Sequence, residues 1–208
     1  MDYVSKYIET LQQLLNKLPL EDIRQVLAEL HRARLEGRQI FIMGNGGSAA
    51  TASHFANDLN KGACVPGAPR FRAIALTDNV AVMSALANDV GYEHSFAEQL
   101  VNLAHPGDVV IGISGSGNSP NVLRAMEVAR SLPALTIGFT GFSGGRLKGL
   151  VDICVLVPSD TMEQVEDVHL MLEHLICSSL RQACLEVAVV SAPEYRPVSR
   201  SMDHAFPV

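Results

Sequence analysis

The 208-residue chain has no tryptophan, only 5% aromatic residues and no excess of positive charge. Its 16 Lys and Arg residues stand against 22 Asp and Glu, and the basic residues form no cluster. Because nucleic-acid binding depends on neutralising phosphates, this balance argues against nucleic acid as a direct partner. No apolar run approaches the roughly 18 residues that span a bilayer, so no membrane partner is expected either.

The chain also lacks any C-x-x-C pair. The four cysteines are scattered along the chain: Cys64, Cys154, Cys177 and Cys184. This pattern predicts free thiols in a reducing compartment. The N-terminal segment mixes acidic and basic residues in an amphipathic pattern, unlike a secretory signal. With 48% hydrophobic and 18% charged residues the chain fills a core easily. These features predict a single-domain, cytoplasmic protein.

Two amphipathic helices are predicted ahead of the first strand, over residues 2–18 and 20–36. Their apolar residues recur at the i, i+3, i+4, i+7 spacing, and Pro19 and Gly37 end them. Neither helix has a sheet of its own to cover, so we expect one of them to pack against another subunit. Residues 1–37 are therefore predicted to be a helical pair used for oligomer packing within the same domain.

Five short apolar runs follow, at 39–43, 71–76, 108–113, 134–139 and 152–157. Helical segments separate them, at 48–60, 79–104 with a break near Gly91, and 119–131, with a short turn at 144–149. This alternation predicts an α/β fold, a single doubly wound domain over 38–190 with a five-stranded parallel sheet flanked by helices. A long helix is predicted over 161–189, and the proline-containing stretch 191–208 is predicted to be a flexible tail.

Two loops rich in glycine and serine follow the first and third predicted strands, Gly44–Ser48 and Ser114–Ser119. Each leads into a helix, whose first backbone N–H groups and positive dipole end favour an anion. Since ligands of parallel sheets bind beyond the carboxyl ends of the strands, we expect these loops to bind phosphate. The alternative is that the glycines only form turns and that Ser48 or Ser119 only caps a helix. Neither loop has the lysine of a Walker A motif or the G-x-G-x-x-G spacing of a dinucleotide site.

Histidines and carboxylates recur at helical spacing on two predicted helices. His54 and Asp58 lie four residues apart and so share a face, although His54 alone is open to a structural interpretation. The final helix carries Glu166, His169, Glu173 and His174. A sugar phosphate held at the loops would meet these groups, and such a set also permits a metal site. The alternatives are a solvated acidic surface and a simple pairing of His169 with Glu173.

Four motifs, taken in order, resemble the SIS (sugar isomerase) domain family. They are Gly44-Asn45-Gly46-Gly47-Ser48 with His54, Asn88-Asp89 before Gly91, Ser114-Gly115-Ser116-Gly117-Asn118-Ser119, and the final helix with Val168-His169 and His174. Taken alone, Asn88-Asp89 is either a turn or a contact to substrate hydroxyls. The resemblance covers about residues 2–185. Within the family the chain most resembles the phosphoheptose isomerases, which act on sedoheptulose 7-phosphate in bacterial heptose synthesis.

The resemblance implies a SIS fold and a homotetramer whose active sites lie between subunits, with the two N-terminal helices helping to build the interface. It also implies which residues bind the phosphorylated sugar. The matching positions are Asn45, Gly46, Gly47, Ser48, Asn88, Asp89, Ser114, Gly115, Ser116 and Ser119. Among them, the serine loop is implied to hold the phosphate and the other positions to line the sugar.

A zinc ion, one per subunit, is a further implication of the resemblance. The positions that match its ligands are His54, Asp58, Glu166 and His174. Asp58 stands where the family has Glu, and Glu166 where it has Gln, but both still offer oxygen donors. The implied reaction is an aldose–ketose isomerisation through an enediol, which yields D-glycero-D-manno-heptose 7-phosphate. Asp58 and His174 are the implied acid/base pair, with Glu166 as a substitute base.

A second interpretation is a non-catalytic SIS protein. One relative of the heptose isomerases is a tetramer that bridges the replication initiator protein at the origin, and it shares the Thr77-Asp78-Asn79-Val80 stretch. The serines, His54 and His174 favour an enzyme, because that relative alters the catalytic positions. A third interpretation, a sugar-phosphate sensor, is disfavoured because no basic pair of helices for DNA is visible.

Overall fold

A computed structural model describes residues 2–191 of the chain, with side chains described as far as Glu186. Its sheet has five parallel strands in the order β2-β1-β3-β4-β5. The strands are β1 (Gln39–Gly44), β2 (Arg72–Ala75), β3 (Val109–Ser114), β4 (Leu135–Thr140) and β5 (Ile153–Leu156). Each predicted apolar run forms one of them and agrees within one residue at either end. The predicted fold class is therefore confirmed.

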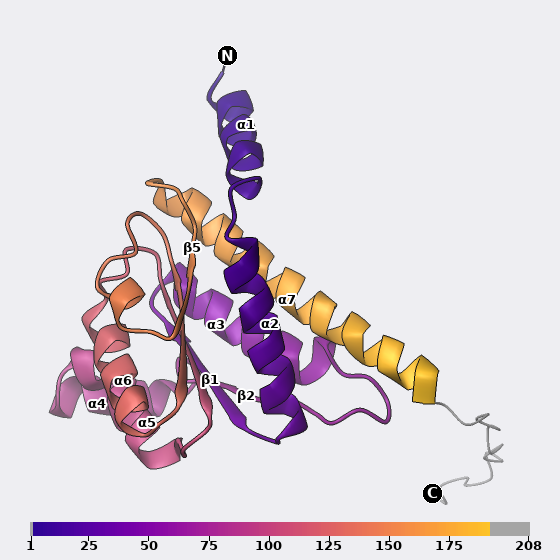
Figure 1. Cartoon of the computed structure of the whole chain (residues 1–208). Helices are drawn as coiled ribbons and strands as arrows, with labels where there is room; N and C mark the ends of the chain where they lie inside the picture. The colour runs from indigo at the N-terminus through magenta and orange to yellow at the C-terminus, as the bar shows by residue number, and fades with distance from the viewer. Residues whose placement is uncertain (1, 192–208) are drawn as a thin grey trace, which may run out of the picture.

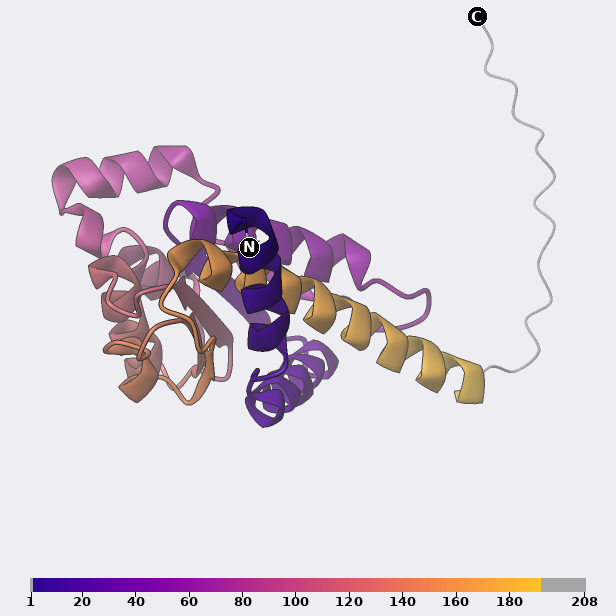
Figure 2. The same ribbon diagram turned by 90° about the horizontal axis from the view of Figure 1, so that it is seen from above.

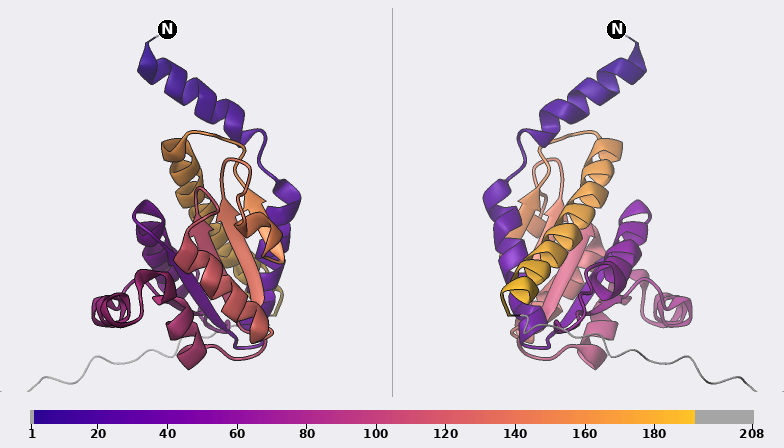
Figure 3. Two further views of the ribbon diagram at one scale, coloured as in Figure 1. Left: turned by 90° about the vertical axis from the view of Figure 1, so that its left-hand side faces the viewer. Right: turned by 90° about the vertical axis from the view of Figure 1, so that its right-hand side faces the viewer.

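Helices cover both faces of the sheet, which explains why the strands are apolar throughout. Alternate residues of β1 face opposite ways: Ile40 and Ile42 join one buried cluster, Phe41 and Met43 the other. The first cluster is completed by α2 (Leu20–Leu35), α3 (Gly47–Asn57) and α7 (Met162–Ser191). The second is completed by α5 (Ala97–Leu103) and α6 (Pro120–Ser131). The resulting three layers are visible in Figures 1 and 3.

The N-terminal helices behave differently from each other. The expectation that neither covers the sheet is wrong for α2, which buries Ile23, Val26 and Leu30 in the core beside α7 and β5. The reason is that β5 and its neighbours expose an apolar face that α3 and α7 alone do not cover. By contrast, α1 (Tyr3–Leu15) buries only Leu14 and extends away from the body (Figure 1).

Between β2 and β3 the predicted long helix is broken into three pieces. These are α4 (Val80–Asp89), the 3₁₀ turn η2 (Tyr92–His94) and α5. The break occurs at Gly91, whose φ of 103° is in the region that favours glycine. Figure 2 shows α4 standing apart from the body, and none of its residues is buried. Two further short pieces are η1 (Asp58–Gly62), which continues α3, and η3 (Leu147–Gly149).

The end of the chain is described only in part. The helix α7 covers the predicted range 161–189 except for residue 161, and it continues to Ser191. The rest of the predicted tail, residues 192–208, lies outside the described residues. None of the helices within residues 2–191 combines the length and apolar character needed to cross a membrane.

The strand order places the two glycine–serine loops at one point of the sheet. β1 and β3 are neighbours, but the chain leaves β1 for α3 on one face and leaves β3 for α6 on the other. This is a topological switch point, where a crevice opens beyond the carboxyl ends of the strands. The loops that follow β1 and β3, singled out from the sequence, lie at this switch point.

Candidate functional site

The two loops are joined by a pair of asparagine side chains. Asn45 in the first loop and Asn121 in the first turn of α6 exchange reciprocal amide hydrogen bonds, both 2.9 Å long. The hydroxyl of Tyr92 donates to the same Asn45 Oδ1 at 2.8 Å. Asn121 and Tyr92 were not predicted from the sequence, because neither stands within a glycine–serine motif. Their hydrogen bonds hold the loops beside each other at the switch point.

The serine hydroxyls of the second loop face one another. Ser114 Oγ and Ser119 Oγ lie 3.0 Å apart. Ser119 occupies the N-cap of α6 without a side-chain capping bond, and the N-cap of α3 is Gly46, whereas Ser48 is buried within the helix. The structure therefore does not show the simple capping role that was the alternative interpretation of these serines. Instead the hydroxyls and the open first turns of α3 and α6 offer donors to an anion.

A third segment supports the serine loop from outside. Gly141 N donates to Gly115 O at 2.8 Å, and Leu147 N donates to Gly117 O at 2.9 Å. Arg146 N donates to the Asn118 side chain at 3.1 Å. The sequence indicated only a short turn here, since contacts between distant loops leave no periodic signal. These bonds occupy the outward-facing groups of the loop, so its conformation is set before any ligand arrives.

Asn88 and Asp89 lie at the exposed end of α4. Their side chains hydrogen-bond to each other at 2.7 Å, and Tyr92, which reaches Asn45, follows three residues later. The structure thus brings their segment to the first loop through Tyr92. It does not place either side chain in contact with the serine loop, so their substrate role stays a prediction.

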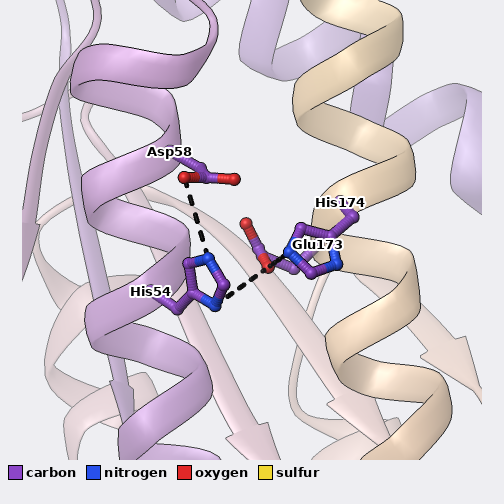
Figure 4. Close-up of side chains that lie close together, drawn as sticks. All are labelled: His54, Asp58, Glu173 and His174. Carbon is purple, nitrogen blue, oxygen red and sulfur yellow. Dashed lines mark ion pairs between the residues drawn. The ribbon is translucent and has the colours of Figure 1, made fainter.

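Four titratable side chains gather between α3 and α7 (Figure 4): His54, Asp58, Glu173 and His174. One potential ligand atom from each lies within 4.8 Å of the others. His54 Nε2 is 3.8 Å from Asp58 Oδ1, while His54 Nδ1 and His174 Nε2 lie 3.9 and 3.5 Å from Glu173 Oε2. His54, Asp58 and His174 were predicted together from helical spacing and from the family resemblance, and the structure does bring these three together.

The fourth member differs from the prediction. Glu173 joins the cluster, whereas Glu166 does not. The reason is position along α7: Glu166 precedes His174 by eight residues, about 12 Å of helix axis, while Glu173 is its direct neighbour. Glu166 lies instead against the first turn of α3, where a Cβ added to Gly47 would be 2.5 Å from Glu166 Oε2. A side chain at position 47 would therefore displace this carboxylate from its present position.

Glu173 is unusual because it is a buried carboxylate. Only 1% of its side chain is exposed, against 24–52% for the other three members of the cluster. Neither oxygen has a hydrogen-bond partner among the described residues. Burial raises the pKa of Glu173 to about 7, His174 opposes this shift, and the nearby Asp58 adds to it. A carboxylate in this position favours a cation between itself and the two imidazoles.

His169 does not pair with Glu173, so that interpretation is wrong. Its ring is buried against Phe139, its Nε2 lies 3.4 Å from Thr140 O, and its Nδ1 has no partner among the described residues. The side chain points from α7 into the sheet, away from the cluster. Burial lowers the pKa of His169 to about 4, opposed by the contact with Thr140.

The depressed pKa of His169 predicts a loss of stability in acid. In the unfolded chain His169 binds a proton below about pH 6.5, whereas in the folded chain it binds one only below about pH 4. Between these two pH values the unfolded state binds more protons, so the free energy of unfolding falls as the pH falls. Between pH 7.5 and 5 this loss is about 2 kcal/mol. Urea unfolding with a metal chelator measures it against His169→Gln, whose amide can still donate to Thr140. Glu173 is present in both the wild type and the variant, so its contribution cancels when their free energies of unfolding are subtracted. If the free energy of unfolding depended on pH equally in the two proteins, the prediction would be contradicted.

Comparison with known proteins identifies the family of the chain. The model of the SIS domain matches residues 2–141. A phosphoheptose isomerase of Trichlorobacter lovleyi is 40% identical over 186 residues, which are 86% of this chain and 93% of the relative. The chain belongs to the SIS family of phosphoheptose isomerases. A phosphoheptose isomerase of Aliarcobacter butzleri is 41% identical over 174 residues, which are 84% of this chain and 87% of the relative.

Solved structures of SIS proteins share the architecture. A phosphoheptose isomerase from Francisella tularensis aligns with a TM-score of 0.80 at 32% identity, over 86% of this chain and 96% of that one. The enzyme from Neisseria gonorrhoeae gives a TM-score of 0.79 at 30% identity, over 86% and 95%. The fold and the family expected from the loop motifs are thus confirmed.

Proposed function

We propose that the chain is a phosphoheptose isomerase that converts sedoheptulose 7-phosphate to D-glycero-D-manno-heptose 7-phosphate, the first step of heptose synthesis. One observation carries the proposal. The hydroxyl-rich loops are held together at the carboxyl edge of the sheet, and the cluster of imidazoles and carboxylates lies along the same helix, α3. The isomerase relatives support the choice of substrate.

The spacing along α3 fits a long sugar phosphate. The first turn of the helix, at Gly47, borders the loops, and His54 lies about 10 Å further along the axis. A phosphate on C7 at the loops therefore leaves C1 and C2, where the hydrogen is transferred, near the cluster. Binding of the remote phosphate serves to orient these carbons.

The reaction requires a base that takes a proton from C1, next to the C2 carbonyl, and an acid that protonates C2, while the hydroxyl proton on O1 passes to O2. We assign these roles to Asp58 and His174, which lie on opposite sides of the α3–α7 gap and are both partly exposed. Glu166 remains a substitute base, because its carboxylate lies beside the first loop at Gly47. Positioned proton transfer of this kind contributes about 10²–10⁴-fold in rate.

The cluster fits a zinc ion. Two imidazoles and two carboxylates are donors that zinc accepts, and the unpartnered, buried oxygens of Glu173 favour a positive charge at this point. Bound there, zinc would polarise the carbonyl and hydroxyl oxygens of the sugar. The protein residues would still orient the substrate and move the proton. A carboxylate that binds zinc is a poor base, so we assign the role of base to Glu166 whenever Asp58 binds the ion.

We further propose that the chain is a cytoplasmic homotetramer with active sites between its subunits. The support is the apolar surface of α1, where several large side chains are exposed in the single chain: Tyr3, Val4, Ile8 and Leu15. Tyr7 on the same helix donates to Asp167, next to Glu166, at 2.6 Å. An interface built on α1 would therefore lie beside Glu166 and a cavity next to the first loop, and would restrict the access of water to that cavity.

Steady-state isomerisation of sedoheptulose 7-phosphate tests the function. The wild-type protein is expected to turn over, and Ser116→Ala to raise KM about tenfold with little change in kcat, because one charge-assisted hydrogen bond to the phosphate is lost. Ser131→Ala, at the far end of α6, is the matched control and is expected to leave KM unchanged. An unaltered KM in Ser116→Ala would remove this hydroxyl from phosphate binding. Absence of turnover in the wild type would refute the isomerase.

The non-catalytic interpretation has little support. The stretch shared with the bridging relative has local structural roles in this chain. Asn79 Oδ1 accepts from Val82 N at 3.1 Å and caps α4, and the Thr77 hydroxyl lies 3.2 Å from the Ser53 hydroxyl. These contacts account for the stretch without a protein partner.

A further inference from the structure

A network of three polar side chains joins separate segments at the switch point of the sheet. Tyr92 lies in η2, Asn45 follows β1, and Asn121 lies in the first turn of α6. The hydroxyl of Tyr92 donates to Asn45 Oδ1 at 2.8 Å, and the two asparagines exchange amide hydrogen bonds of 2.9 Å. We call these three side chains the asparagine network. It connects the segments that follow β2, β1 and β3.

A backbone group sets the direction of every hydrogen bond in the asparagine network. Val122 N donates to Asn121 Oδ1 at 3.0 Å. Because a backbone N–H can only donate, this atom of the Asn121 amide has to be its oxygen, and the amide nitrogen faces Asn45 Oδ1. The nitrogen of Asn45 then faces Asn121 Oδ1. Since Asn121 is 1% exposed, water does not replace these bonds, and neither amide turns over without losing them.

This arrangement leaves Asn45 with one free hydrogen-bond donor. Its Oδ1 accepts from both Tyr92 and Asn121, which fills the two acceptor positions of an amide oxygen. Its Nδ2 carries two hydrogens, and among the described residues it donates to Asn121 alone. A reciprocal amide pair uses the N–H on the same side as the carbonyl oxygen, so the second N–H points away from Asn121. Asn45 therefore has a hydrogen bond to donate to a ligand and none to accept.

Tyr92 reaches the asparagine network from a partly exposed position. Its side chain is 50% exposed, and α4, which precedes it, contains no buried residue. Gly91, with a φ of 103°, turns the chain between α4 and Tyr92. Loss of the Tyr92 hydroxyl alone is therefore expected to change how Asn45 is held far more than it changes the stability of the fold.

We propose that Tyr92 and Asn121 are positioning residues, which act through Asn45 and present its free N–H to an oxygen of the phosphorylated sugar. The phosphate, carbonyl and hydroxyl oxygens of such a sugar all accept hydrogen bonds, so a fixed donor suits this class of ligand. The inference rests on the proposed function, because it concerns the same loop. It deepens that function by making Asn45 a donor and by assigning roles to two residues outside the loop motifs.

A double-mutant cycle tests whether Tyr92 acts through Asn45. Tyr92→Phe is expected to lower kcat/KM for sedoheptulose 7-phosphate about fivefold, the effect of one hydrogen bond, with a Tm within about 2 °C of wild type. In the Asn45→Ala background the same substitution should change kcat/KM by less than about twofold, because the group that Tyr92 positions is gone. Equal effects in the two backgrounds would overturn the proposal. Tyr3→Phe, which keeps an exposed ring and removes its hydroxyl, is the matched control and should leave kcat/KM unchanged.

NMR spectra of isotope-labelled protein without substrate test the asparagine network itself. The side-chain amide signals of Asn45 are identified as those absent from Asn45→Ala. Tyr92→Phe and Asn121→Ala are expected to shift these signals, whereas Asn102→Ala, at an exposed position of α5, should leave them in place. Unmoved signals in Tyr92→Phe would overturn the proposal. If the wild type shows no turnover, the proposed function fails, and these spectra alone decide whether Tyr92 and Asn121 position Asn45.

Discussion

Replacing His174 with alanine is expected to lower kcat/KM for sedoheptulose 7-phosphate by about 10²–10⁴-fold. His174 is 52% exposed, lies beside the buried Glu173 and packs edge-on against His54 with ring centroids 4.9 Å apart. No other described side chain places an imidazole at this position. The loss should fall mainly on kcat, because the loops proposed to bind the phosphate lie at the other end of α3. Reactions quenched at fixed times and analysed for ketose phosphate and aldose phosphate give both kcat and KM.

The control for this variant is His105→Ala, an exposed histidine at the opposite edge of the sheet. It is expected to keep wild-type kinetics. The assays are run with added Zn²⁺ as well as without, so that weaker metal binding in His174→Ala is compensated. If His174→Ala retains turnover within a few-fold of wild type at saturating zinc, then His174 is not the acid or base of the reaction.

The sheet could be predicted because its signals are local. Each strand is a short apolar run such as Val109–Ser114, bounded by glycine, proline or a helix start, and a strand buried on both faces has no alternative position in the fold. The positions of the two glycine–serine loops were predictable for the same reason. A strand end, a glycine with positive φ such as Gly46 and a helix start are adjacent in the sequence.

The composition of the cluster was only partly predictable. Spacing of four residues put His54 and Asp58 together, because the relation is internal to one helix. Whether Glu166 or Glu173 lies beside the two histidines depends on the axial position of α7 relative to α3. Helical periodicity carries no information about this tertiary arrangement. The reciprocal bonds of Asn45 and Asn121 were missed for a similar reason: they join residues 76 positions apart.

Replacing Gly117 with alanine is expected to have the largest effect on stability. Its φ of 66° is strained for any residue with a Cβ, and the added Cβ would overlap the Gly144 carbonyl oxygen. Relief requires the serine loop to move away from the segment that supports it, which breaks the bond from Leu147 N to Gly117 O. We expect a loss of about 3 kcal/mol or more, equivalent to a fall in Tm of roughly 6–12 °C.

Because the same loop carries Ser114, Ser116 and Ser119, Gly117→Ala should also raise KM for the phosphorylated sugar by more than the single hydroxyl lost in Ser116→Ala. Gly149→Ala is the matched control, since a Cβ there meets no heavy atom within 4 Å and its φ is not in the positive region. It is expected to melt and bind substrate as the wild type does. A Gly117→Ala protein with wild-type Tm would mean that the loop tolerates another conformation. A lower Tm with unchanged KM would mean that phosphate is bound elsewhere.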